Sequence, residues 1–218
     1  MQKYAHEVNM MSIIATDPSP NLAILHGHAI MRTGPKIIGT INMSLAPGIS
    51  VHNWVSQRLT DHVPRVHTWP SFTQTLVNAI DWLHQRGIVH MDLHSGNIIV
   101  DPASKCLTVI DFGFACIPSE SNPCEQAVNL EFSCPEKGMQ DRGDLLAMMK
   151  DDAYSVGALA YYWYFGCPPF GYAHWDEEKH IVHCYVALYD KTKEEYPPEL
   201  NLIDKEGDIM MMLLQKKS

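Results

Sequence analysis

The sequence predicts an α+β fold in which a small β-rich segment precedes a mainly helical body. Two runs of β-type residues, 22–31 and 36–43, lie near the start of the chain. Apolar residues at helical spacing and one continuous apolar stretch come later and indicate a helical core. The chain has 218 residues, of which 46% are hydrophobic, and this is enough for one domain with its own core.

The β-rich segment is predicted to begin with a helix at residues 4–15, where apolar residues recur on one face. A stretch with two prolines at 17–20 ends this helix, because proline cannot continue it. The strands 22–31 and 36–43 then follow, and residues 32–35 form a turn that contains glycine and proline.

The body is predicted to begin with an amphipathic helix over 72–87, followed by short strands at 97–100 and 107–110. Residues 114–149 contain several prolines and are predicted to be mostly loop. The apolar run 153–165 is expected to be a buried helix, and the rest of the chain to be helix and loop.

Composition excludes several classes of function. The formal net charge is -9 and no cluster of Lys and Arg is present, which argues against nucleic acid as a partner. The apolar run 153–165 has 13 residues, whereas a membrane span needs about 20, so we expect no membrane association. No signal peptide is visible, and an intracellular protein, cytoplasmic or nuclear, is expected.

The six cysteines show no paired spacing of the C-x-x-C type, which zinc sites require. In an intracellular protein, scattered cysteines are expected to be reduced thiols with a structural role.

Three oxygen-bearing side chains are predicted to meet at one cleft. Asp92 and Asn97 flank a tight turn between a helix and a strand, and Asp111 directly follows the paired strand. Because a short hairpin brings its two ends together, the three side chains can converge. A carboxylate and an amide oxygen suit Mg²⁺, and the remaining carboxylate can accept a proton from a substrate hydroxyl. Gly113 allows the backbone to turn sharply after Asp111.

Five ordered motifs resemble those of the protein kinase superfamily. Residues 90–97 (HMDLHSGN) resemble the catalytic loop, and 111–113 (DFG) follow at the usual distance. Residues 132–136 (FSCPE) resemble the motif that closes the activation segment. Residues 152–157 (DAYSVG) resemble the start of the central buried helix, and 166–170 (GCPPF) the stretch after it. The resemblance implies a protein-kinase-like fold with a partial β-rich N-lobe and a mainly helical C-lobe.

By this resemblance Asp92 is the catalytic base, Asn97 binds the second Mg²⁺ ion, and Asp111 is the principal metal ligand. His94 stands where Ser/Thr kinases carry a lysine that contacts the γ-phosphate, so it joins the candidate catalytic residues. The resemblance therefore implies ATP and Mg²⁺ as cofactors.

The resemblance also implies an adenine site. Residues 44–48 resemble the hinge to which adenine hydrogen-bonds, with contacts at Ser44 and Ala46. Met43 takes the gatekeeper position, and Ile99 is expected to pack beneath the adenine ring.

Supporting roles follow from the same resemblance. Glu7 lies where the family has the glutamate of helix C, and Asp152 is expected to hold the backbone of the catalytic loop. His90 and Phe112 are expected to stack in the hydrophobic spine that couples the lobes.

The sequence departs from the family at three places. A Gly-rich loop and a strand lysine should precede Glu7, where only six residues stand, so a domain truncated before helix C and near its C-terminal end is expected. Met91 replaces the arginine that receives an activation-loop phosphate. His94 replaces lysine, and this form of the loop also occurs in small-molecule kinases of the same fold.

The resulting hypothesis is a single domain over 1–218, with a remnant N-lobe and hinge at 1–45 and a C-lobe at 46–218. It is expected to be a protein kinase that acts on Ser/Thr hydroxyls of a protein substrate. Two alternatives remain: a catalytically impaired module that binds or inhibits another kinase or its substrate, and a fragment of a longer kinase.

Overall fold

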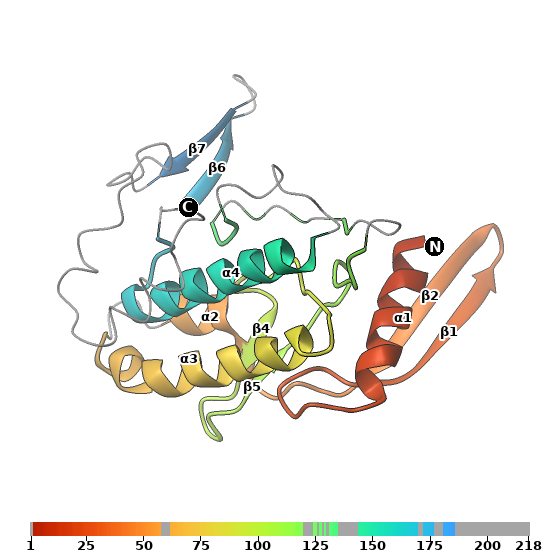
Figure 1. The fold of residues 1–218 in the computed structure, drawn as a ribbon, viewed down its shortest axis with the longest axis horizontal. Coiled ribbons are helices and arrows are strands. Elements are labelled where there is room, and N and C mark those ends of the chain that lie inside the picture. The colour runs from red at the N-terminus through yellow and green to blue at the C-terminus, as the bar shows by residue number, and fades with distance from the viewer. Residues whose placement is uncertain are drawn as a thin grey trace.

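The computed structural model describes residues 2–57, 62–119, 124, 125, 127, 129, 131–134, 144–169, 172–176 and 181–185. At 62–66, 172–176 and 181–185 it describes the backbone. Figure 1 shows a helix and a hairpin at one side of the molecule and a helical body beside them. The α+β fold is therefore confirmed.

The N-terminal unit consists of helix α1 (Gln2–Ala15) and the strands β1 (Leu25–Thr33) and β2 (Lys36–Met43). The two strands pair antiparallel, from Thr33 opposite Lys36 to Leu25 opposite Met43. The helix and the second strand agree with the sequence to within two residues. The first strand begins three residues later than predicted, because Leu22 pairs with Val109 of the body instead.

Helix α1 lies against one face of the hairpin. The ring of Tyr4 sits over Gly39, where an added Cβ would lie 2.5 Å from the ring. The Tyr4 hydroxyl is 3.0 Å from the carbonyl oxygen of Ala29 and 3.2 Å from that of Thr40, so it can donate to either strand. A glycine in β2 therefore admits the ring that fixes the helix to the hairpin.

The body is built on two long helices that run side by side, α3 (His62–His84) and α4 (Leu145–Phe165). The short helix α2 (Val51–Ser56) precedes them. A small antiparallel sheet lies on these helices, in the order β3 (Ile49–Ser50), β4 (Ile98–Val100) and β5 (Leu107–Val109). The strands β4 and β5 agree with the predicted strands to within one residue at each end.

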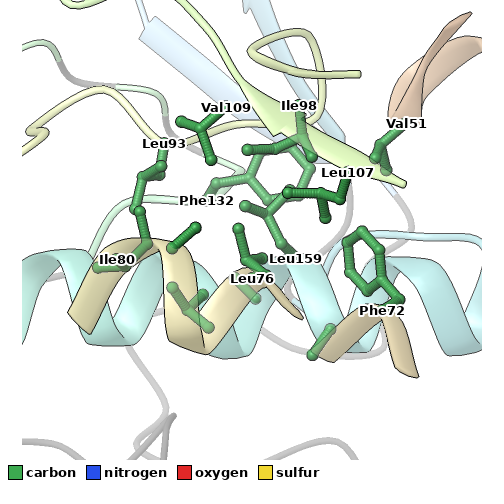
Figure 2. Close-up of a cluster of buried hydrophobic side chains, with 14 of the residues drawn as sticks. Val51, Phe72, Leu76, Ile80, Leu93, Ile98, Leu107, Val109, Phe132 and Leu159 are labelled. Carbon is green, nitrogen blue, oxygen red and sulfur yellow. The ribbon is translucent and has the colours of Figure 1, made fainter. Parts of the chain in front are cut away.

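The core lies between the sheet and the two long helices, and Figure 2 shows its centre. Leu76 of α3, Leu159 of α4 and Ile98 of β4 are fully buried there. Phe132 enters from the loop before α4 and meets the Tyr162 ring edge to face. This layer holds the strands that carry the candidate site residues.

Helix α4 begins at Leu145, eight residues before the predicted start, so the prediction of loop up to residue 149 is wrong at its end. Asp144 caps the helix by accepting hydrogen bonds from the backbone N–H groups of Leu146 and Ala147. The helix ends at Gly166, which takes a left-handed φ of 84°. The sequence placed the start of the helix too late because Lys150, Asp151 and Asp152 interrupt the apolar residues.

A third strand pair, β6 (Tyr172–Asp176) with β7 (Ile181–Tyr185), lies after α4. The prediction of helix and loop for this part of the chain is therefore wrong at these residues. Residues 135 and 136, which complete the FSCPE motif, and Phe170 lie outside the described residues.

Cys116 and Cys124 form a disulfide, so the expectation of reduced thiols is wrong for this pair. Two hydrogen bonds between Val89 and Cys116 fix Cys116 beside the catalytic loop, and the Cα atoms of Cys116 and Cys124 are 6.0 Å apart. That distance lies in the range that a disulfide spans. Cys106 is an exposed free thiol.

None of the helices within the described residues is long and apolar enough to cross a bilayer.

Candidate active site

The turn at residues 90–97 brings Asp92 and Asn97 together. The Asn97 side-chain N–H₂ group donates to the Asp92 backbone carbonyl at 3.0 Å and lies 3.4 Å from its carboxylate. The Asn97 backbone N–H donates to the carbonyl of His94 and closes the turn. Because its nitrogen is engaged in this way, Asn97 leaves its amide oxygen available as a ligand.

The His94 ring also lies near the Asp92 carboxylate. Its Nδ1 accepts a hydrogen bond from the Gly96 backbone N–H at 3.0 Å. In the neutral ring the proton is therefore assigned to Nε2, which is 3.9 Å from the Asp92 carboxylate. An added Cβ at Gly96 would lie 2.8 Å from the imidazole, so glycine leaves room for this orientation.

Asp111 is held at the end of the hairpin that carries Asn97. The Ile110 backbone N–H donates to the Asn97 carbonyl at 2.9 Å, which places the next residue beside the turn. Asp111 takes a left-handed φ of 65°, and its carboxylate accepts a hydrogen bond from the Gly113 N–H at 3.1 Å. The carboxylate is exposed. Such a backbone conformation costs about 1–3 kcal/mol in a non-glycine residue and is common at functional sites.

The backbone of the catalytic loop rests on Asp152 of α4, which is fully buried. Its carboxylate accepts hydrogen bonds from the backbone N–H groups of His90 at 2.7 Å and Met91 at 2.9 Å. These contacts hold Met91 at a left-handed φ of 65°. The expected support of the loop by Asp152 is therefore present.

His84, at the end of α3, completes this arrangement with its Nε2 3.0 Å from the Asp152 carboxylate. Burial raises the pKa of Asp152, but the hydrogen bond and charge of His84, with the contribution of His90, lower it below its ordinary value overall. The carboxylate thus stays ionised in the core. Sequence reasoning missed His84, since one histidine at a helix end carries no signal of a partner 68 residues away.

His90 and Phe112 are in contact, as expected, with ring centroids 5.4 Å apart and planes tilted by 52°. Burial lowers the pKa of His90, while the charges of Asp152 and Asp92 oppose that shift. His90 is therefore neutral at pH 7 and acts as a buried packing group between the carboxylates.

Met91 occupies the position where the family has an arginine, and its side chain is buried. It packs in a second apolar cluster with Val89, Met148 and the disulfide cysteines. Met91 thus places an apolar, buried side chain where the family has a charged one.

The residues assigned to the adenine site line the connection between the two parts of the molecule. Ser44 is bound to Ile24 by its backbone N–H and its hydroxyl. Within the described residues, the backbone groups of Ala46 make no hydrogen bond, so they are available to a ligand. Met43 is half-buried, and Ile99 lies on the face of β4 opposite to the buried Ile98 and Val100.

Glu7 of α1 lies near Asp111. Burial raises the pKa of the Glu7 carboxyl, repulsion from Asp111 raises it further, and the charge of His6 lowers it in part. His6 also contacts the Ala115 carbonyl at 2.7 Å, so α1 is fixed to the segment that follows Asp111.

The donor set fits Mg²⁺. Asp111 offers a carboxylate and Asn97 an amide oxygen, and Mg²⁺ binds few protein ligands while it keeps waters and phosphate oxygens. Among the described residues no group of three or more His, Cys, Asp or Glu could hold a metal, which argues against a zinc-type site there.

In sequence the chain is similar to known protein kinases. The family profile described as "Protein kinase domain" matches residues 2–218. CBL-interacting protein kinase 3 of Oryza sativa subsp. japonica is 27% identical over 197 residues, which are 88% of this chain and 38% of that protein. Serine/threonine-protein kinase kin-29 of Caenorhabditis briggsae is 35% identical over 116 residues, 52% of this chain and 13% of that protein.

Among solved structures, the Cydia pomonella granulovirus kinase PK-1 superposes with a TM-score of 0.68 at 21% identity, covering 96% of this chain and 74% of that one. This similarity supports a protein-kinase-like fold. The chain spans less than two fifths of the length of the two curated relatives named above.

Proposed function

The chain belongs to the protein kinase domain family, and on that premise we propose that it transfers the γ-phosphate of ATP to a Ser/Thr hydroxyl of a protein substrate. The observation that carries the proposal is the turn in which Asn97 donates to Asp92 while the Ile110 backbone N–H donates to the Asn97 carbonyl, so that Asp111 follows directly beside the turn. The names of relatives such as serine/threonine-protein kinase kin-29 support the choice of acceptor.

In the proposed reaction, the Asp92 carboxylate orients the substrate hydroxyl and accepts its proton. Asn97 and Asp111 would hold Mg²⁺, which would supply positive charge to neutralise the ATP phosphates. The Nε2–H of His94 donates a hydrogen bond to the transferring phosphoryl group or to Asp92. The backbone of Ala46 and the carbonyl of Ser44 bind the adenine, with Met43 and Ile99 beside its ring.

Asp152 and His84 act as positioning residues. The buried carboxylate fixes two consecutive amides of the loop and so sets the direction in which the Asp92 side chain leaves the backbone. A preorganised loop matters because phosphoryl transfer depends mainly on positioning and electrostatics.

Nucleotide binding is tested by thermal unfolding with and without ATP and Mg²⁺. We expect a rise in the midpoint temperature that requires Mg²⁺ and is lost in Asp111→Ala. Asp81→Ala, which removes an exposed carboxylate of α3, is the matched control and should keep the shift. A shift that survives Asp111→Ala would contradict the metal assignment.

Catalysis is tested by transfer of labelled phosphate from ATP to a generic Ser/Thr protein substrate. Removing the base in Asp92→Asn should lower the rate by about 10²–10⁴-fold while ATP binding persists. Transfer that continues at the original rate in this variant would exclude Asp92 as the base.

A second candidate function is a binding module that inhibits another kinase or occupies its substrate. Glu7 favours it, because this half-buried carboxylate faces Asp111 and forms no ion pair within the described part of the chain. In the family a lysine pairs with this glutamate and binds the phosphates. If the chain is such a binding module, the purified chain should slow substrate phosphorylation by an active Ser/Thr kinase. The Asp92→Asn variant of the chain should slow that reaction equally.

A further inference from the structure

A cavity lies in the body at the far end of the β4–β5 hairpin from the candidate active site. Its volume is about 230 Å³. Val100 and Leu107, at the closed end of the hairpin, form one wall, whereas Asn97 and Asp111 lie beyond the open end. The cavity is therefore separate from the proposed nucleotide site.

Aromatic rings form another part of the lining. The indole of Trp163 is sandwiched between Trp54, at a centroid distance of 4.1 Å, and Phe72, at 4.0 Å. All three side chains are almost fully buried. The Trp163 N–H donates to the Thr68 hydroxyl, so the wall offers a ligand an apolar surface and no indole donor from Trp163.

The size of the cavity restricts its ligand. An apolar cavity of about 150 Å³ is known to hold benzene, so 230 Å³ accommodates a single ring or an indole. Pockets for larger molecules such as nucleotides typically have about 300–1,000 Å³. A compact apolar ring fits, and ATP does not.

The mouth of the cavity carries the positive charge of Lys105 and the negative charge of Asp101. Lys105, in the turn between β4 and β5, forms no ion pair with any residue that the structure describes. The neighbouring carboxylate of Asp101 is engaged by its own turn, because it accepts hydrogen bonds from Ala103 and Ser104. The exposed hydroxyl of Ser71 lies at the same mouth. The mouth thus offers an ammonium and a hydroxyl to an anionic group.

We propose that this cavity binds a small aromatic carboxylate, with the ring against Trp54, Phe72 and Trp163 and the carboxylate beside Lys105 and Ser71. The proposal does not depend on the kinase activity. It assigns a ligand site to a part of the body that the proposed function does not use.

Binding is tested on the full chain with indole-3-acetate, by calorimetry and by ligand-observed NMR. A ligand of this size is expected to bind with a dissociation constant on the order of 1 mM or lower. Tryptamine, which has the same ring with a cationic group, and acetate, which lacks the ring, should bind more weakly. Equal binding of tryptamine would overturn the role of the carboxylate.

Variants locate the ligand. Lys105→Gln should weaken binding by about fivefold, the upper range for an exposed ion pair. Ser71→Phe closes the mouth and should abolish binding, whereas Gln74→Phe on the same helix, which does not line the cavity, should leave it unchanged. Unaltered binding in Ser71→Phe would overturn the site.

Two further measurements use the wild-type chain and so do not depend on a variant that folds. Cys106 is an exposed thiol at the mouth, and indole-3-acetate should slow its alkylation by iodoacetamide, as followed by peptide mass spectrometry. ATP with Mg²⁺ should not displace the ligand. Unchanged alkylation of Cys106, or displacement by ATP, would overturn the proposal.

Discussion

The hairpin of the N-terminal unit and the helical body differ in how far their apolar side chains are covered. On the hairpin Ile30, Met31, Ile37 and Ile38 are between 43% and 56% exposed. In the body Leu76, Leu83 and Leu159 are completely buried. Both segments are apolar in sequence, so composition does not account for the difference.

The difference arises from the number of layers that cover each sheet. The hairpin is a two-stranded sheet with α1 on one face, and an isolated hairpin has marginal stability. In the body the sheet lies on α3 and α4, and residues from many segments fill the space between them. The turn at residues 90–97 belongs to the well-packed part, while the N-terminal unit reaches the candidate site with Glu7 and His6.

The largest expected effect is in the core of the body. Leu159→Ala removes a completely buried side chain and should lower the free energy of unfolding by about 2–5 kcal/mol. Ile37→Ala, at a position 55% exposed in the hairpin, should change it by less than about 0.5 kcal/mol. Urea unfolding followed by circular dichroism measures both. Equal losses of unfolding free energy in the two variants would contradict the difference in packing between the two regions.

Asp152→Asn tests the polar anchor of the body. An amide nitrogen cannot accept, so at least one of the three donors around this side chain loses its partner, at about 1–3 kcal/mol. Asp81→Asn, on the exposed side of α3, is the control and should be close to neutral. If Asp152→Asn unfolds at the same urea concentration as wild type, the carboxylate does not anchor the loop.

Gly48, in the connection between the two regions, has a φ of 110°, and an added Cβ would lie 2.0 Å from the Val100 carbonyl oxygen. Gly48→Ala should therefore cost about 1–3 kcal/mol in the same unfolding experiment. Gly27→Ala in the hairpin meets no atom within 4 Å and should be nearly neutral. The reverse order of these two variants would refute the close approach at the connection.

Acidification should act on the body through His90. Its folded pKa lies below 6.5 because of burial, so the unfolded chain takes up the proton first and stability falls as the pH drops below about 6.5. Asp152, whose folded pKa is lowered from 3.8, adds a further loss below that value. His90→Phe should flatten the first part of this decline, measured as unfolding free energy against pH. His28→Phe, on the exposed hairpin, should leave this pH dependence of the unfolding free energy unchanged. Identical pH profiles for both variants would contradict the assignment of the decline to His90.

The smallest effect is expected for Tyr4→Phe in the N-terminal unit. It removes the hydroxyl that bonds to Ala29 or Thr40 and keeps the ring over Gly39, so the loss should be about 0.5–1 kcal/mol. Thermal unfolding measures the difference. A loss above 2 kcal/mol would mean that the hydroxyl, rather than ring packing, fixes α1 to the hairpin.

Local patterns in the sequence were sufficient for the elements whose signals are short-range. The strands β2, β4 and β5 follow from runs of β-type residues, the helix α1 follows from apolar residues at helical spacing, and prolines and glycines mark the turns between them. The order of the motifs from residue 90 to residue 170 was enough to indicate the family. The start of α4 was misplaced, because charged residues in its second turn hid an apolar face that tertiary packing buries.

Tertiary structure decided the contacts between residues that are distant in the chain. The Asp152 carboxylate contacts the side chain of His84, which lies 68 residues earlier in the chain, and the backbone N–H of His90, which lies 62 residues earlier. No local pattern in the sequence encodes such a pairing. The disulfide and the cavity between α3, α4 and the β4–β5 turn likewise depend on how separate segments meet. The sequence by itself determined which residues are candidates for the chemistry, since their types and spacing are local. The packing of α4 beneath the loop decided how those residues are held, because burial and long-range hydrogen bonds form only when the layers assemble.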